Sequence, residues 1–139
     1  MATYNKFQSF VEAVAEKKHN LGADTLKVLL TNTAPVNTNT VKADLTEISA
    51  GNGYTAGGTA ATISASAQSS GTYKLTLADV VFTASGGSIG PFRYAVLYND
   101  TASNDELIGW WDRGSSLTLA DGDSVTIDFD ASNGVLTIA

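Results

Sequence analysis

Cysteine is absent from this 139-residue chain, and histidine occurs once, at His19. Without cysteine the protein has no disulfide framework, no thiolate nucleophile and no cysteine-bound zinc ion. Any Ser-His-Asp triad would have to use His19, which follows a predicted helix and has no nucleophile-elbow motif near it. Glu47, Glu106 and Asp112 show no glycosidase-like spacing, although folding can still bring two carboxylates together. We therefore expect no enzymatic activity and no cofactor.

Positive charge is also scarce, because eight Lys and Arg residues stand against 14 Asp and Glu residues and give a net charge of −6. Binding to nucleic acid requires clustered basic side chains, and the adjacent pair Lys17-Lys18 is the only cluster in the sequence. No run of about 18 apolar residues is present, and residues 1–6 lack the apolar core of a secretory signal. We expect a soluble protein, made in the cytoplasm, that contacts neither nucleic acid nor a membrane.

One amphipathic helix is predicted over residues 4–18, within an N-terminal segment of residues 1–20. Apolar residues recur there at helical spacing, and they are Tyr4, Phe7, Phe10, Val11, Val14 and Ala15. Thr3 is the expected N-cap, and Gly22 is the expected left-handed residue after the helix. So short a helix does not persist alone in water. The stripe of Phe7, Phe10, Val11 and Val14 should therefore pack on the chain's own sheets or on a partner.

Beyond this segment the apolar period changes from helical to alternating, which is typical of strands. Strands are expected over residues 25–31, 59–66, 72–83, 92–98, 107–112, 124–130 and 135–138, with a bulge at Ala78-Asp79. Residues 92–98 are apolar on both faces, which indicates a central strand. Turn dipeptides such as Asp121-Gly122 and Asn133-Gly134 separate several of the strands. The sequence predicts one mainly β domain over residues 1–139: an antiparallel β-sandwich or barrel of seven to eight strands over 21–139, with one N-terminal α-helix.

Residues 51–58 read GNGYTAGG, and their first six residues satisfy the loose dinucleotide-binding pattern G-x-G-x-x-G/A. That pattern binds pyrophosphate only where a strand precedes it and a helix N-terminus follows it. Residues 59–64 resemble a strand, and no P-loop lysine follows the glycines. We therefore expect a mobile or sharply turning loop and no nucleotide site.

Four carboxylates near the C-terminus prompt a test for calcium, and they are Asp121, Asp123, Asp128 and Asp130. Their spacing does not match an EF-hand loop. Asp128 and Asp130 alternate with apolar residues as on the solvated face of a strand, and Asp121-Gly122 is typical of a turn. The sequence predicts no metal ion, and an irregular calcium site stays open as an alternative.

Trp110 and Trp111 are adjacent, so in a strand their side chains point to opposite faces. One ring can enter the core, and the other then lies on the outer face or under a neighbouring element. The favoured interpretation is that the fold covers both rings. The alternatives are that an outward tryptophan, with Tyr54, Tyr94 or Tyr98 nearby, anchors a protein interface or stacks on a sugar.

Three stretches carry a family resemblance, and they read TYNKFQSFVEAVAEKKHNLGADTLKVLLTNTAPV, AGNGYTAGG with the downstream FTASGGSIGPFRYAVLYNDTA, and LIGWWDRGSSLTLADGDSVTIDFD. They resemble small virion structural proteins of tailed bacteriophages, most of all the proteins that decorate, or cement, the capsid surface. Similar sequences also occur among tail-associated virion proteins. The resemblance implies a β-sandwich or barrel, no catalysis and assembly with many copies of the major capsid protein. It supplies no catalytic or ligand-binding residue.

On this resemblance we expect a homo-oligomer, taken as a trimer, that binds the lattice of the major capsid protein on the virion surface and stabilises the head. The alternatives are a tail, neck or fibre component that contacts host glycans, and a soluble carbohydrate-binding module. The candidate interface residues are Phe7, Phe10, Val11, Val14, Pro35, Tyr54, Trp110 and Trp111. The irregular stretches 32–40 and 51–58 are the expected contact loops.

Overall fold

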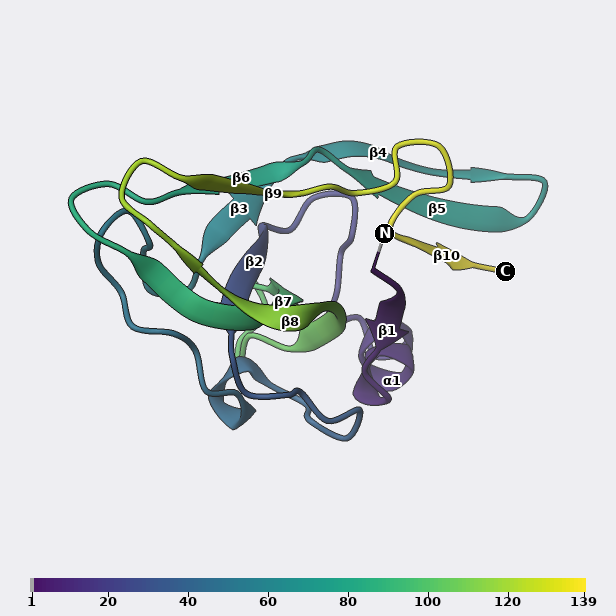
Figure 1. The fold of residues 1–139 in the computed structure, drawn as a ribbon. Coiled ribbons are helices and arrows are strands. Elements are labelled where there is room, and N and C mark those ends of the chain that lie inside the picture. The colour runs from purple at the N-terminus through teal and green to yellow at the C-terminus, as the bar shows by residue number, and fades with distance from the viewer. Residues whose placement is uncertain (1) are drawn as a thin grey trace.

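The computed structural model describes residues 2–139 and is mainly β, with antiparallel sheets in two layers (Figure 1). One layer is a five-stranded sheet in the order β1-β8-β7-β2-β3. Its strands are β1 (Tyr4–Lys6), β8 (Leu107–Leu119), β7 (Ile89–Asn99), β2 (Leu26–Thr31) and β3 (Thr59–Ala61). This architecture confirms the antiparallel sandwich-like fold and the central position of the strand around residues 92–98.

The other layer consists of two smaller sheets that lie across the top of the five-stranded sheet in Figure 1. The three-stranded sheet has the order β10-β5-β4, and its strands are β10 (Leu136–Ile138), β5 (Thr72–Leu77) and β4 (Ile63–Ser69). The two-stranded sheet pairs β6 (Val80–Thr83) with β9 (Ser124–Ile127). A helix, α1 (Ser9–Ala15), and a 3-10 turn, η1 (Lys42–Asp44), complete the fold.

Apolar clusters cover both faces of the five-stranded sheet around its central strands, and the alternation along β2 explains how. Leu26, Val28 and Leu30 point into the main core between the layers, where they meet Leu75 and Phe82 from the other layer. Leu29 points to the opposite face, in a second cluster whose buried members are Phe7, Leu29, Val96, Tyr98 and Leu107. Full burial of one such side chain contributes about 1.5–3 kcal/mol, so the two clusters account for much of the stability.

The predicted helix over residues 4–18 is wrong in its bounds. Tyr4–Lys6 instead forms β1 and pairs with the edge of β8, so the helix begins only at Ser9 and ends at Ala15. Thr3 therefore does not cap it, and the left-handed residue that follows the helix is Lys17, with φ of 67°, rather than Gly22. Pairing with β8 satisfies backbone groups that a short helix would leave to water, and this tertiary gain exceeds local helix propensity.

Two predicted strands prove to be pairs of strands, because the chain changes sheet inside each of them. The stretch 59–66 divides at Thr62 into β3, which pairs with β2, and β4, which pairs with β5. The stretch 72–83 divides at the predicted bulge into β5 and β6, which belong to different sheets. Asp79 fastens the second crossing by accepting a hydrogen bond from the Phe129 N–H at 2.9 Å. The predicted bulge at Ala78-Asp79 is therefore wrong: the register of the apolar residues changes there because one strand ends and another begins.

Candidate functional site

The glycine-rich loop of residues 51–58 is held by side chains of its own chain. The Glu47 carboxylate accepts the Gly57 N–H at 2.7 and 2.9 Å, and the Tyr98 hydroxyl donates to the Gly57 carbonyl at 2.6 Å. A strand, not a helix, follows at Thr59. The Glu47 carboxylate thus occupies the Gly57 N–H. In a phosphate-binding loop, backbone N–H groups of this kind bind the ligand instead. The prediction of a turning loop is confirmed.

Tyr54, a candidate interface residue, is buried to 2% exposure and supports β2 from within. Its hydroxyl accepts the Leu30 N–H at 3.0 Å and donates to Glu47 at 3.1 Å. Burial raises the pKa of the Tyr54 phenol, which keeps it protonated for this donation. β3 pairs with β2 only as far as Val28; beyond it, the Ile48 N–H donates to the Leu30 carbonyl at 3.1 Å and Tyr54 accepts the Leu30 N–H. The free chain therefore does not present Tyr54 at its surface.

The two tryptophans lie on opposite faces of β8, as predicted, and other aromatic rings pack against both. The Trp110 and Phe7 ring centroids are 4.5 Å apart, on the face of the second cluster. Trp111 packs in the main core with Tyr4 and Phe129, each with a centroid separation of 5.4 Å. Trp111 also lines a cavity of about 480 Å³. Both rings remain half-buried, so the chain covers them only in part.

The predicted apolar stripe of the N-terminal segment does not form one surface. Phe7 is fully buried in the second cluster, whereas Phe10 packs in the main core and Val14 is half-buried against it. Val11 points away and is 55% exposed. The stripe divides because Phe7 precedes the helix instead of lying on it. Pro35, also a candidate contact, is buried.

The C-terminal carboxylates hold turns. Asp121 accepts the Gly86 N–H at 2.9 Å, and Asp130 accepts the N–H groups of Ser132 and Asn133 at 2.8 Å each. Hydrogen bonds from Asn133 lower the pKa of Asp130. Within residues 2–139, no group of three or more His, Cys, Asp or Glu side chains is placed to hold a metal ion. The contact of Asp121 agrees with the turn interpretation. The prediction that Asp128 and Asp130 lie on the solvated face of a strand is wrong, because β9 ends at Ile127 and Asp130 holds the turn that follows.

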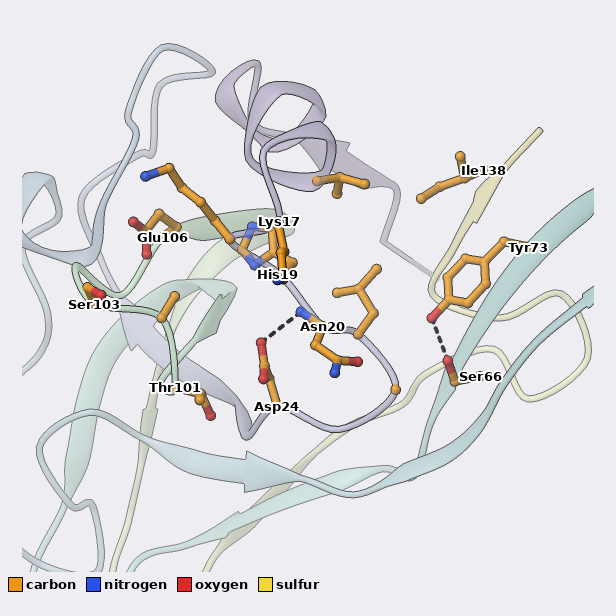
Figure 2. Close-up of a pocket in the computed structure, with 15 residues that line it drawn as sticks. Lys17, His19, Asn20, Asp24, Ser66, Tyr73, Thr101, Ser103, Glu106 and Ile138 are labelled. Carbon is orange, nitrogen blue, oxygen red and sulfur yellow. Dashed lines mark hydrogen bonds between the residues drawn. The ribbon is translucent and has the colours of Figure 1, made fainter.

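A cavity of about 790 Å³ opens between the end of α1, the turn around residues 101–106 and the sheet β10-β5-β4 (Figure 2). One wall carries Ser66, Tyr73 and Ile138 from that sheet. The facing wall carries polar and charged side chains, which are Lys17, His19, Asn20, Asp24, Thr101, Ser103 and Glu106. Sequence reasoning considered His19 and Glu106 separately and did not bring them together.

His19 is buried to 8% exposure, and its tautomer follows from its neighbour Asn99. The Asn99 side-chain oxygen accepts the N–H groups of Thr101 and Ala102 at 2.9 and 3.2 Å, so its amide nitrogen faces the other way. That nitrogen donates to Asp24 at 2.7 Å and lies 3.0 Å from His19 Nδ1. His19 Nδ1 is therefore an acceptor, and the ring proton sits on Nε2. Among residues 2–139, Nε2 has no hydrogen-bond partner.

Electrostatics keep His19 neutral at pH 7. Burial lowers the pKa of the imidazole, and the nearby carboxylates of Glu106 and Asp24 raise it by less. Glu106 is itself 8% exposed, and within the described chain its carboxylate accepts only long hydrogen bonds of 3.4 Å from Asn104. The wall of the cavity thus contains a donor that is shielded from solvent, His19 Nε2–H, and a weakly paired buried acceptor, the Glu106 carboxylate.

Comparison with protein-family models, with curated proteins and with solved structures gives no match to this chain. Across residues 2–139, no helix has the length and apolar character needed to cross a membrane. The fold and the cavity define the structural class of the protein, which is a two-layer antiparallel β protein with a polar cavity at one end of the smaller layer.

Proposed function

We propose that this chain is a non-enzymatic structural protein of a bacteriophage virion that decorates the capsid as an oligomer and stabilises the head. The family resemblance supplies the biological setting. The observation that carries the proposal is the exposed, uncharged edge strand β4, a surface suited to association with other protein chains.

Six of the seven residues of β4 are exposed, and its sequence, ISASAQS, contains neither charge nor proline. Within the described chain β4 pairs on one side only, so the backbone groups along its outer edge are free. Monomeric proteins usually protect such edges with lysine, proline or bulges. Here a register shift between Ile63 and Ala65 affects the start of the strand alone. The remaining edge favours pairing with another chain.

Other surface features suit a component present in many copies. The large apolar side chains that are exposed are dispersed over the sequence, and they are Val11, Val36, Val81 and Ile138. With charged residues at 16% of the sequence, desolvation of this surface costs little. Weak contacts, each of about 1 kcal/mol, add up across a lattice of identical sites through multivalency.

The test compares phage heads that carry the wild-type chain with heads that lack it. A protein that binds only the mature shell stabilises that state by mass action, so decorated heads should retain DNA at higher temperature. Dye-accessible DNA reports the release. Ala67→Lys, which adds a charge to the exposed β4, should leave folding intact and reduce decoration. Ala120→Lys, on an exposed turn outside β4, is the matched control and should decorate normally. Equal heat resistance of decorated and undecorated heads would contradict the proposal.

A further inference from the structure

The cavity beside α1 leaves two buried polar groups incompletely used. His19 Nε2–H is a donor without a partner in residues 2–139, and the Glu106 carboxylate accepts only the two long bonds from Asn104. An unsatisfied buried donor is destabilising, so such a group in a native fold needs an explanation. A ligand group that accepts from Nε2 and donates to the carboxylate would satisfy both.

The fixed tautomer and the charge balance narrow the chemistry of that group. A metal ion would need a lone pair on Nε2, which would place a proton on Nδ1 opposite the amide donor of Asn99. The cavity lining carries two positive side chains, Lys17 and Lys18, and two negative ones, Asp24 and Glu106, so its formal charge is zero. This balance favours neither an anion nor a cation. A neutral group that both accepts and donates a hydrogen bond fits best, and a hydroxyl is such a group.

The remaining walls match a compact ligand with several hydroxyls. Asn20, Thr101 and Ser103 line the polar side, and Leu21, Tyr73 and Ile138 present apolar surface to the same cavity (Figure 2). A sugar ring has the same division between hydroxyl-bearing edges and apolar C–H faces. The volume of about 790 Å³ lies in the range of small-molecule sites, about 300–1,000 Å³.

We propose that this cavity binds a neutral saccharide whose hydroxyls donate to the Glu106 carboxylate and accept from His19 Nε2–H, which is shielded from solvent in the free chain and is uncovered on binding. Most of its polar groups come from the end of α1, the following loop and the turn at 101–106, and only Ser66 and Tyr73 come from strands. That placement favours a compact ligand over an extended peptide. The inference goes beyond the structural role proposed above and does not depend on it.

The test is an NMR titration of the full chain, following backbone amides and the His19 ring nitrogens. Glucose, galactose, mannose, rhamnose and N-acetylglucosamine are added separately, up to about 100 mM, because single-sugar sites bind weakly. At least one sugar should produce saturable shifts at His19, Thr101 and Ser103. Acetate and trialanine serve as probes for a carboxylate and a peptide. No saturable shift with any sugar, or tighter binding of either probe, would overturn the proposal.

Variants connect the binding to the two buried groups. His19→Phe removes Nε2–H but keeps an aromatic ring beside Phe10. It should lower the affinity for the sugar by at least about tenfold. Glu106→Gln preserves the shape of the side chain and should lower the affinity for the sugar by a smaller factor. Glu16→Gln makes the same chemical change at an exposed residue outside the cavity, and should bind as the wild type does. Thermal unfolding checks that each variant is folded. Unchanged affinity in a folded His19→Phe chain would refute the assignment.

Discussion

At the scale of single residues, three side chains hold the glycine-rich loop against β2 and β7. Glu47 binds the Gly57 amide, Tyr98 binds the Gly57 carbonyl, and Tyr54 joins Glu47 to the Leu30 amide. Burial raises the pKa of both tyrosines, so both remain protonated donors across the physiological range. The loop is therefore part of the folded framework.

Tyr54→Phe tests this network. Loss of the hydroxyl leaves the buried Leu30 N–H without its acceptor and removes one donor from Glu47, which should lower the free energy of unfolding by about 1–3 kcal/mol. Urea denaturation measures the change. Tyr73→Phe is the matched control, because its hydroxyl bonds only to exposed Ser66, and it should cost less than about 0.5 kcal/mol. Equal costs for the two variants would contradict the network.

His19 makes stability depend on pH above the range in which carboxylates titrate. Its folded pKa is lowered from 6.5 by burial, so near that pH the unfolded chain binds a proton that the folded chain does not. The contribution of neutral His19 to stability is therefore fully present above pH 6.5, and it is lost as pH falls through the folded pKa of His19. Urea midpoints at about pH 7.5 and 5.5 should differ more for the wild type than for His19→Phe. The same pH dependence in both chains would exclude this role.

At the scale of elements, the N-terminal segment is attached by a strand and one aromatic anchor. Phe7 is fully buried against Trp110, and Val11, on the same predicted stripe, faces solvent. Phe7→Ala should lower the free energy of unfolding by about 3–5 kcal/mol, since it leaves a cavity in the second cluster. Val11→Ala should change it by less than about 0.5 kcal/mol. Similar values in urea denaturation would restore the single-stripe interpretation.

Gly58 lets the glycine-rich loop of residues 51–58 approach the backbone of β2 closely. Its φ is +80°, and a Cβ there would overlap the Val28 carbonyl, whereas Gly71 has φ of +83° and open space around it. Gly71→Ala should therefore cost only the left-handed penalty of about 1–2 kcal/mol. Gly58→Ala should cost at least about 1 kcal/mol more, because the backbone must also shift. Thermal unfolding of the pair separates the effect of backbone angle from that of close approach.

The period-2 pattern predicted the strands well where each strand stays in one sheet, as β2 and β7 do. It did not reveal the crossings at Thr62 and around Asp79, because alternation continues while the partner strand changes. The sequence did not predict the strand Tyr4–Lys6, because its pairing with β8 depends on residues more than a hundred positions away. The sequence did not predict the cavity for the same reason, since Asn99, which fixes the His19 tautomer, is 80 positions away in the chain.

At the scale of the whole molecule, the smaller layer combines the two features that we interpret functionally. Its sheet β10-β5-β4 ends in the uncharged edge strand β4 and also forms one wall of the cavity beside His19. In Figure 1 the β4–β5 hairpin extends beyond the five-stranded sheet. On the β4 side this projection has no further strand within the described chain, so contact with another chain would add one there.

The most direct test of the structural role is cryo-electron microscopy of virions with and without this chain. The proposal predicts density that fits the two-layer fold at symmetry-related positions on the head surface, next to the major capsid protein, and its loss when the chain is absent. The β4 edge should face a neighbouring chain. Density for this fold on the tail or neck, or virions indistinguishable with and without the chain, would contradict capsid decoration.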